Sequence, residues 1–166
     1  MKPRHLKRLE TAFGARRLIL YCLIAVLSVL VCSSIHKFLQ SDRMGAAAER
    51  GDLDTIRDLI KEGVNPKGTG MHAMTPLMRA AKGAQLEACR LLIRNGSDVN
   101  EHNDSGSVLM WAIDSESKDI VELLIENRVD LDWESVAGEG ALRFAKEKKA
   151  TDIIDILTRE HGNSPR

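Results

Sequence analysis

The clearest structural pattern in the chain lies in residues 75–100, TPLMRAAKGAQLEACRLLIRNGSDVN. Thr75 can cap the free backbone N–H groups that open a helix, and Pro76 is pre-set for the first helical turn. A second helix follows, and Gly96 suits the left-handed residue that ends many helices. The apolar residues of the second helix are spaced to share one face: Cys89, Leu92 and Ile93. The stretch therefore predicts two short helices joined by tight turns.

The same order of residues recurs along the chain at a step of about 33 residues. An alanine marks the first helix of each copy, at Ala47, Ala80, Ala112 and Ala145. The apolar spacing of the second helix also recurs, as Ile56, Leu59, Ile60 and as Val121, Leu124, Ile125. One helix pair cannot bury such a face by itself, so the period indicates helix pairs stacked in an array.

This pattern resembles the ankyrin repeat, whose usual line runs roughly DxxGxTPLHxAAxxGxxxIVxxLLxxGADVN. The second copy matches it at Thr75, Pro76, Leu77, Ala80, Ala81, Leu92, Gly96, Asp98, Val99 and Asn100. The third copy departs from it, because Ser107 and Val108 replace Thr-Pro and Arg128 stands at the helix-ending glycine. The resemblance covers roughly residues 42–162 and implies an all-α, ankyrin-like helical solenoid of about four repeats.

The predicted organisation has four parts. A basic leader at residues 1–17 precedes a transmembrane helix at 18–39, a repeat domain at 40–162 and a tail at 163–166. The repeats are expected at residues 42–67, 71–100, 104–132 and 136–162. The first helix of repeat 1 is expected to be short, with Ser41 or Asp42 as its N-cap. Lys146 and Thr158 replace apolar residues in the last copy, as suits a terminal repeat that no successor covers.

The segment from Leu18 to Ile35 carries no charge and as a helix would reach ~27 Å, close to the hydrocarbon thickness of a bilayer. A buried core helix is one alternative, but a stacked array has no place for a helix that is apolar all round. A cleaved signal peptide is another, and the long leader and weak cleavage pattern favour a retained anchor. Residues that mark the predicted span are Leu18, Leu23, Leu27, Val31 and Ile35.

Charge predicts the orientation of this single-pass protein. Six cations precede the span: Lys2, Arg4, Lys7, Arg8, Arg16 and Arg17. The positive-inside rule then places the N-terminus in the cytoplasm and the repeats on the far side, which is periplasmic for a bacterial source. From Gln40 onward, 17 lysines and arginines face 23 aspartates and glutamates. This acidic balance argues against nucleic acid as a partner.

The sequence contains no recognised catalytic, phosphate-binding or metal-binding motif, so we expect neither an enzyme nor a cofactor. His72 and His102 fall in successive turns, but two histidines leave most of a metal's coordination shell unfilled, and solvated turn residues are expected. One side of the span carries small side chains: Cys22, Ala25, Ser28 and Cys32. They indicate either weak homodimerisation through the helix or an ordinary lipid-facing surface.

The family resemblance implies protein binding through the turn tips and the exposed side of the first helices. Carried onto this chain, it selects Met71, His72, Met74, Lys82, Glu101, His102, Asn103, Asp114, Trp133 and Glu147. Tryptophan is strongly enriched in binding hot spots, which draws attention to Trp133. Its alternative role is to fold back onto a neighbouring turn or onto repeat 4. Trp111, beside an anchor alanine, is expected to pack between repeats.

These observations predict a membrane-anchored scaffold whose ankyrin-like repeats bind a partner protein near the membrane. The alternative is an exported and released inhibitor or immunity-type binding protein. The N-terminus of the mature protein distinguishes the two, because processing near Ser34 would release the repeats. The sequence does not identify the partner, and a membrane protein is one candidate.

Overall fold

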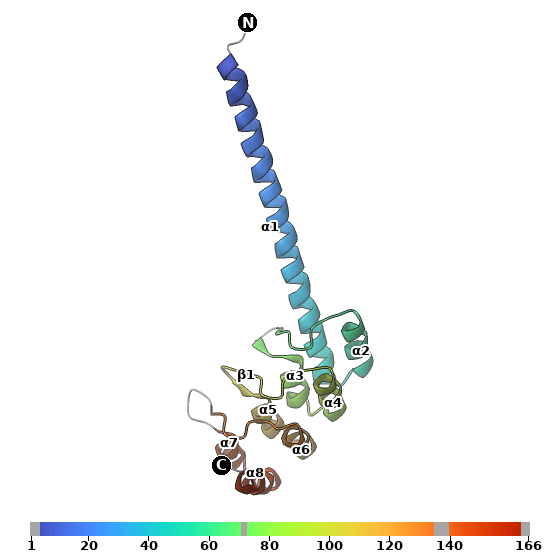
Figure 1. The fold of residues 1–166 in the computed structure, drawn as a ribbon. Helices are drawn as coiled ribbons and strands as arrows, with labels where there is room; N and C mark the ends of the chain where they lie inside the picture. Colours follow the sequence, from blue (N-terminus) through green and yellow to red (C-terminus); the bar gives the residue numbers. More distant parts are fainter. Residues whose placement is uncertain (1–3, 71–72, 135–139, 164–166) are drawn as a thin grey trace. The chain divides into compact units, whose positions relative to one another are not determined.

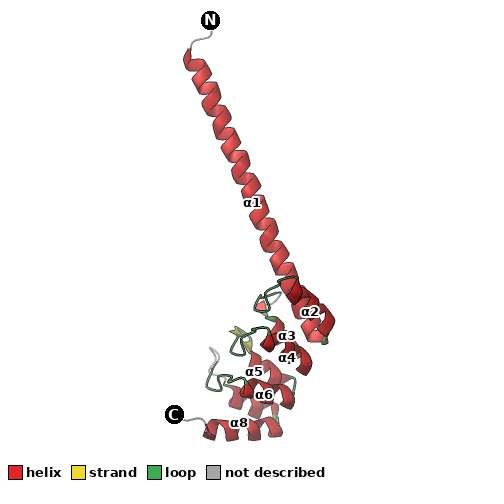
Figure 2. Ribbon diagram, turned by 45° about the vertical axis from the view of Figure 1, so that its right-hand side comes forward, coloured by secondary structure: helices red, strands yellow, loops and turns green. Residues whose placement is uncertain are grey.

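The computed structural model describes residues 4–70, 73–134 and 140–163, in which helices dominate and one short hairpin is the exception (Figure 2). The chain divides into two compact units, residues 1–37 and 38–166. The helices are α1 (Arg4–Arg50), α2 (Leu53–Lys61), α3 (Pro76–Lys82), α4 (Leu86–Arg94), α5 (Val108–Asp114), α6 (Lys118–Glu126), α7 (Ala141–Lys148) and α8 (Thr151–Asn163). The hairpin pairs β1 (His102–Asn103) with β2 (Gly106–Ser107) in antiparallel fashion.

Residues 38–166 form a helical solenoid of four stacked pairs. The last turns of α1 pair with α2, and the pairs α3/α4, α5/α6 and α7/α8 follow in order (Figure 1). The first helices α3, α5 and α7 pack side by side, and the second helices α2, α4, α6 and α8 form a second row. This arrangement confirms the predicted all-α array.

The core lies between the two rows of helices. All four anchor alanines have no exposed surface: Ala47, Ala80, Ala112 and Ala145. The apolar positions of the second helices are equally buried, with Ile56, Leu92 and Leu124 each at 0% exposure. Small side chains in one row and branched side chains in the other therefore let successive pairs pack closely.

The two unusual ends of repeat 3 keep the geometry of repeat 2. Thr75 Oγ1 accepts a hydrogen bond from the Met78 backbone N–H at 3.3 Å, and Ser107 Oγ accepts one from Met110 at 3.3 Å. Arg128 adopts the left-handed conformation with φ of 61°, where Gly96 has φ of 92°. A serine cap thus replaces Thr-Pro, and an arginine occupies the position at which glycine is usual.

The start of repeat 1 differs from the sequence-based expectation. Neither Ser41 nor Asp42 caps a new helix, because α1 continues without a break to Arg50. No glycine or proline lies between the apolar segment and Met44, so the sequence gives the helix no reason to stop. The first helix of repeat 1 is therefore the end of α1, and it buries Met44 and Ala48 in the core.

Stacking predicts a large difference between two adjacent leucines of α4. Leu92 has 0% exposure and Leu91 is half-buried. Leu92→Ala should lower the free energy of unfolding by about 2–5 kcal/mol, because it leaves a cavity between repeats. Leu91→Ala should cost clearly less. Urea unfolding of the full chain in detergent micelles, followed by tryptophan fluorescence, measures both, and equal losses would contradict the stacked core.

Candidate protein-binding surface

Ion pairs join the first helix of repeat 1 to that of repeat 2. Glu49, near the end of α1, accepts hydrogen bonds from Arg79 Nε at 3.1 Å and from Arg79 Nη2 at 2.9 Å. Lys82 Nζ lies 3.5 Å from the other carboxylate oxygen of Glu49. Two cations of α3 therefore hold one carboxylate of α1.

Arg79 is the centre of this junction. Its guanidinium also donates to Asp42 Oδ1 at 3.0 Å and to the Asp42 carbonyl oxygen at 3.3 Å. The Arg79 side chain is only 17% exposed, and its aliphatic part crosses α1 above Gly45, where an added Cβ would lie 2.8 Å from Arg79 Cδ. Burial by itself would raise the pKa of Glu49, but the Arg79 hydrogen bonds and charge, together with Lys82, outweigh it and lower that pKa.

The contacts continue across the first helices of repeats 3 and 4. Lys82 Nζ lies 5.9 Å from the centre of the Trp111 ring, which suits a cation–π contact. Asp114 of α5 forms an ion pair with Lys148 of α7. Trp111 is half-buried against the core, which confirms its predicted packing between repeats. The exposed charges on this face therefore partly neutralise one another.

The turn tips of repeats 2 and 3 are linked by an aromatic pair. The rings of His102 and Trp133 lie 5.0 Å apart at an angle of 30°. Asn103 Nδ2 donates to the Ala73 carbonyl oxygen at 3.3 Å, and Asn100 Oδ1 accepts from the Asp130 backbone N–H at 2.7 Å. Trp133 thus folds onto the neighbouring turn, as its alternative interpretation predicted. His102 is exposed and Trp133 half-buried, so the pair still presents aromatic surface.

Glu101 is the carboxylate of the turn region with the least favourable surroundings. Its Oε2 atom is buried and has no hydrogen-bond partner within the described residues. Burial raises the pKa of Glu101, a hydrogen bond with Thr75 only partly opposes this, and the charge of Asp98 adds to it. The folded protein therefore disfavours the charged form of Glu101 at neutral pH, whereas it favours the charged form of Glu49.

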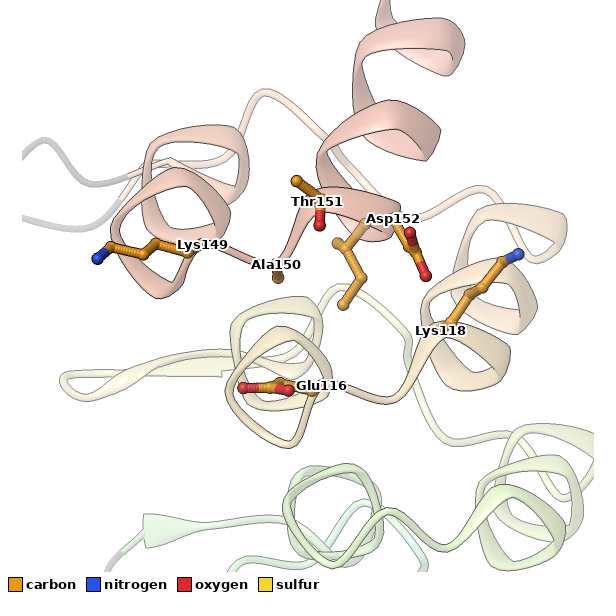
Figure 3. A pocket seen from close by; sticks show the side chains of 7 residues that line it. Glu116, Lys118, Lys149, Ala150, Thr151 and Asp152 are labelled. Atoms are coloured by element: carbon orange, nitrogen blue, oxygen red, sulfur yellow. The ribbon is translucent and has the colours of Figure 1, made fainter.

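A cavity of about 180 Å³ lies between the helix-connecting turns of repeats 3 and 4 (Figure 3). Two acids and two lysines contribute to its lining: Glu116, Lys118, Lys149 and Asp152. These charges balance, and the cavity lies at the opposite ends of the helices from the His102–Trp133 pair. Across the described part of the chain, no group of three or more His, Cys, Asp or Glu residues could hold a metal ion.

Helix α1 is the one described helix that is long and apolar enough to cross a membrane, judged by length and composition. Its apolar side chains are exposed to an unusual degree, with Leu27 at 62%, Val31 at 51% and Ile35 at 54%. Leu18 and Leu23 lie on the same helix. These five residues are the ones that the sequence assigned to the span.

The family model for ankyrin repeats (3 copies) matches residues 44–135. The chain belongs to the ankyrin-repeat family. The matched region begins in the last turns of α1 and ends just after Trp133, so it covers the first three helix pairs, and the structure adds the fourth. Ankyrin repeats generally mediate protein–protein binding, and the family is typically non-catalytic.

Several curated proteins are similar to this ankyrin chain. A transient receptor potential cation channel subfamily A member 1 homolog from Caenorhabditis elegans is 27% identical over 124 residues, or 72% of this chain and 10% of the channel homolog. An ankyrin repeat, SAM and basic leucine zipper domain-containing protein 1 from Nomascus leucogenys is 27% identical over 96 residues, 55% of this chain and 20% of that protein. A Fowlpox virus protein named for its ankyrin repeats is 30% identical over 118 residues, 70% of this chain and 17% of that protein.

This chain therefore spans at most 20% of the length of these three relatives.

The structure separates the predicted partner-binding residues into three groups. Met71 and His72 lie outside the described residues. Met74 is only 7% exposed and packs in the core, so its assignment to the ankyrin binding surface is wrong. The Gly70 backbone N–H donates to the Met74 carbonyl oxygen at 3.2 Å, and the Met74 side chain belongs to the same core cluster as Leu77. The others remain on the surface, exposed at Lys82, His102, Asp114 and Glu147, and half-buried at Glu101, Asn103 and Trp133.

Sequence reasoning did not find Arg79. A signal was present, because an arginine stands among apolar residues in TPLMRAA, and acids lie seven residues apart at Asp42 and Glu49. Residues seven apart lie near one face of a helix, so both carboxylates could reach a single cation. This signal was missed because the apolar helix was expected to end at residue 39, so Asp42 and Glu49 were not placed on one continuous helix.

Replacing Arg79 tests the junction. Arg79→Met should lower the free energy of unfolding by about 1–3 kcal/mol at neutral pH, because it removes the hydrogen bonds and charge of Arg79 from two partly buried carboxylates. Since the pKa of Glu49 is lowered in the folded state, its contribution is present above its ordinary value of 4.5 and is lost as pH falls through the folded pKa. The deficit of the variant should therefore shrink in acid.

Arg57→Met is the matched control for this experiment, because Arg57 pairs with Asp54 where both side chains are exposed, at 50% and 93%. It should cost less than about 1 kcal/mol. Urea unfolding across a pH series measures both variants. A deficit of Arg79→Met that is the same at neutral and acid pH would contradict the electrostatic origin.

Glu101 should behave in the opposite way. Because the pKa of Glu101 is raised in the folded state, its charged form disfavours folding at neutral pH, and the penalty disappears as pH falls through the folded pKa. Glu101→Gln should therefore stabilise the array at neutral pH and not in acid. Glu126→Gln, at an exposed position, is the control. Destabilisation by Glu101→Gln at neutral pH would contradict this assignment.

Proposed function

We propose that the protein is a membrane-anchored scaffold whose ankyrin repeats bind a partner protein near the membrane. The observation that carries the anchor is the exposure of large apolar side chains along α1. They are Ile24, Val26, Leu27, Val29, Leu30, Val31, Ile35, Phe38 and Leu39, each between 46% and 67% exposed. An apolar surface of this length would be a liability in water and is what a lipid-facing helix requires.

Polar groups in the apolar segment also suit a bilayer. Ser28 Oγ donates to the Ala25 carbonyl oxygen at 2.8 Å, and Ser34 Oγ donates to the Leu30 carbonyl oxygen at 2.9 Å. Each hydroxyl is therefore satisfied within its own helix, which removes most of the penalty for placing it in hydrocarbon. The serines do not argue against a membrane span.

The proposed topology follows from charge. The basic residues of the leader remain in the cytoplasm, and the ankyrin repeats lie on the far side of the membrane, which is the periplasm for a bacterial source. The sequence pattern favours retention of α1 as an anchor. Weak pairing of two α1 helices stays a prediction. It would use the small residues on one side of the span: Cys22, Ala25, Ser28 and Cys32.

The partner is proposed to bind the array around the His102–Trp133 pair. Elsewhere on the first-helix face, Lys82, Asp114 and Lys148 have partners within the array. Breaking such partly exposed pairs to bind a protein gains little free energy. Partly exposed aromatic rings held by a neighbouring turn bury apolar area with little loss of conformational freedom. Asn103 is proposed to lie at the edge of this surface, and Glu147 further along the face of the first helices.

The anchor is tested by placing charges in the middle of the apolar segment. Leu27→Arg with Val31→Arg should abolish membrane integration, because each arginine costs about 2.5–3.5 kcal/mol near the centre of a spanning helix. Leu27→Ala with Val31→Ala keeps the segment uncharged and should leave the chain in the membrane fraction after carbonate extraction.

Mass spectrometry of the mature N-terminus completes this test. An intact leader is expected, and a chain that begins near Ser34 would favour the exported and released inhibitor instead. An alkaline phosphatase fusion after Gly162 should be active, since the repeats are proposed to lie outside the cytoplasm. An inactive but stable fusion would contradict the topology.

The hot spot is tested by crosslinking in intact membranes. Trp133→Ala should weaken partner binding by about 30-fold, the equivalent of a hot-spot loss of about 2 kcal/mol. Thr158→Ala on the exposed side of α8 is the control and should bind normally. Helix content should be unchanged in both variants. Normal binding by a folded Trp133→Ala chain would contradict the proposed role.

A further inference from the structure

The turn that follows α2 packs against α1 and forms one edge of the ankyrin array. Figure 1 shows this turn running from α2 across α1 towards α3. A Cβ added to Gly68 would clash with Ser41 Oγ, and one added to Gly70 would lie 2.7 Å from Asp42 Cα. Ser41 is 7% exposed as a result. Residues 65–70 are therefore fixed against the α1 turn that begins at Ser41.

The surface of α1 is apolar immediately before this contact. Phe38 is 46% exposed and Leu39 is 58% exposed, and both belong to the same compact unit as the repeats. Because a helix rises 1.5 Å per residue, Leu39 lies only ~3 Å along the axis from Ser41. The polar layer on each side of a bilayer is about 5–7 Å thick. A bilayer that covers Leu39 would therefore bring its headgroups to residues 65–70.

The charges at this edge favour such a contact. Arg43 and Lys67 are exposed, and neither forms a close ion pair with another described residue, although the charge of Arg43 acts on Asp52 and that of Lys67 acts on Glu101. Lys61 is also exposed and pairs with Asp58 at 3.0 Å, and Glu62 is the exposed acid nearby in sequence. Long cationic side chains can extend along apolar surface and place their charge among lipid phosphates. The two cations without close ion pairs are thus suited to an anionic surface.

We propose that residues 65–70 together with Arg43, here called the headgroup rim, rest on the membrane surface and bind lipid phosphate groups through Arg43 and Lys67. The proposal rests on the membrane anchor proposed above and extends it to the array. The bilayer would then cover the outer edge of repeat 1, which leaves that edge unavailable to a partner protein. A partner protein would then be bound by repeats 2 to 4, where the His102–Trp133 pair lies.

Spin labels on the full chain in vesicles test this proposal. Cys22→Ser and Cys32→Ser remove the cysteines of the span, and Cys89 stays because it is buried. Labels are placed singly at Leu27, Thr69 and Asp104, in vesicles of phosphatidylcholine and phosphatidylglycerol. Relaxation by oxygen and by a water-soluble nickel chelate reports depth. We expect Leu27 in hydrocarbon, Asp104 in water, and Thr69 shielded from nickel relative to Asp104.

Charge reversal then tests the role of the two cations. Arg43→Glu with Lys67→Glu should raise the nickel accessibility of Thr69 to that of Asp104. Arg128→Glu with Arg159→Glu makes the same change in net charge at exposed positions of repeats 3 and 4 and should leave Thr69 shielded.

The possible failures are distinguishable. If Leu27 lies in hydrocarbon while Thr69 is as accessible as Asp104, the headgroup rim is wrong and the anchor stands. If Thr69 is shielded but the Arg43 and Lys67 reversal has no effect, binding of lipid phosphate is wrong. If Leu27 itself is accessible to nickel, the anchor fails and the rim fails with it.

Discussion

Each helix pair of the array is stable only because the next pair covers its apolar face. Anchor alanines with no exposed surface let the first helices approach, and the second helices fill the remaining space with leucine, isoleucine and valine. This constraint also explains the ends of the array. At the N-terminal end the final turns of α1 complete repeat 1, and at the C-terminal end Lys146 and Thr158 face solvent, where no further repeat follows within the described chain.

The array could be predicted from sequence because its information is local and repeated. A cap, a run of apolar residues and a left-handed residue recur at fixed spacing, and Ser107 and Arg128 replace the usual residues without changing the backbone. The continuity of α1 and the role of Arg79 could not be predicted in this way. Arg79 contacts residues 30 and 37 positions away, and no local pattern encodes such a pairing. Met74 was misplaced because a turn residue can point inward.

The candidate binding surface shows the same division. Turn tips and first-helix positions were located from the repeat, and most of them lie on the surface. Their energetic roles needed coordinates, because neighbouring charges decide them. Arg79 holds Glu49 in its charged form, whereas burial disfavours the charge on Glu101. The aromatic pair likewise joins residues 31 positions apart, His102 and Trp133, which no single repeat contains.

We infer that the ankyrin core is complete without the apolar segment of α1, which leaves that segment available for the proposed membrane anchor. The most direct measurement is the unfolding of a chain that begins at Phe38, the first residue of the second compact unit. We expect a helical protein that unfolds in a cooperative transition, with the Ala80 and Leu92 amides protected from hydrogen exchange. If this shortened chain were unfolded, and folded only when residues 18–37 were restored, the apolar segment would belong to the core and the inference would be wrong.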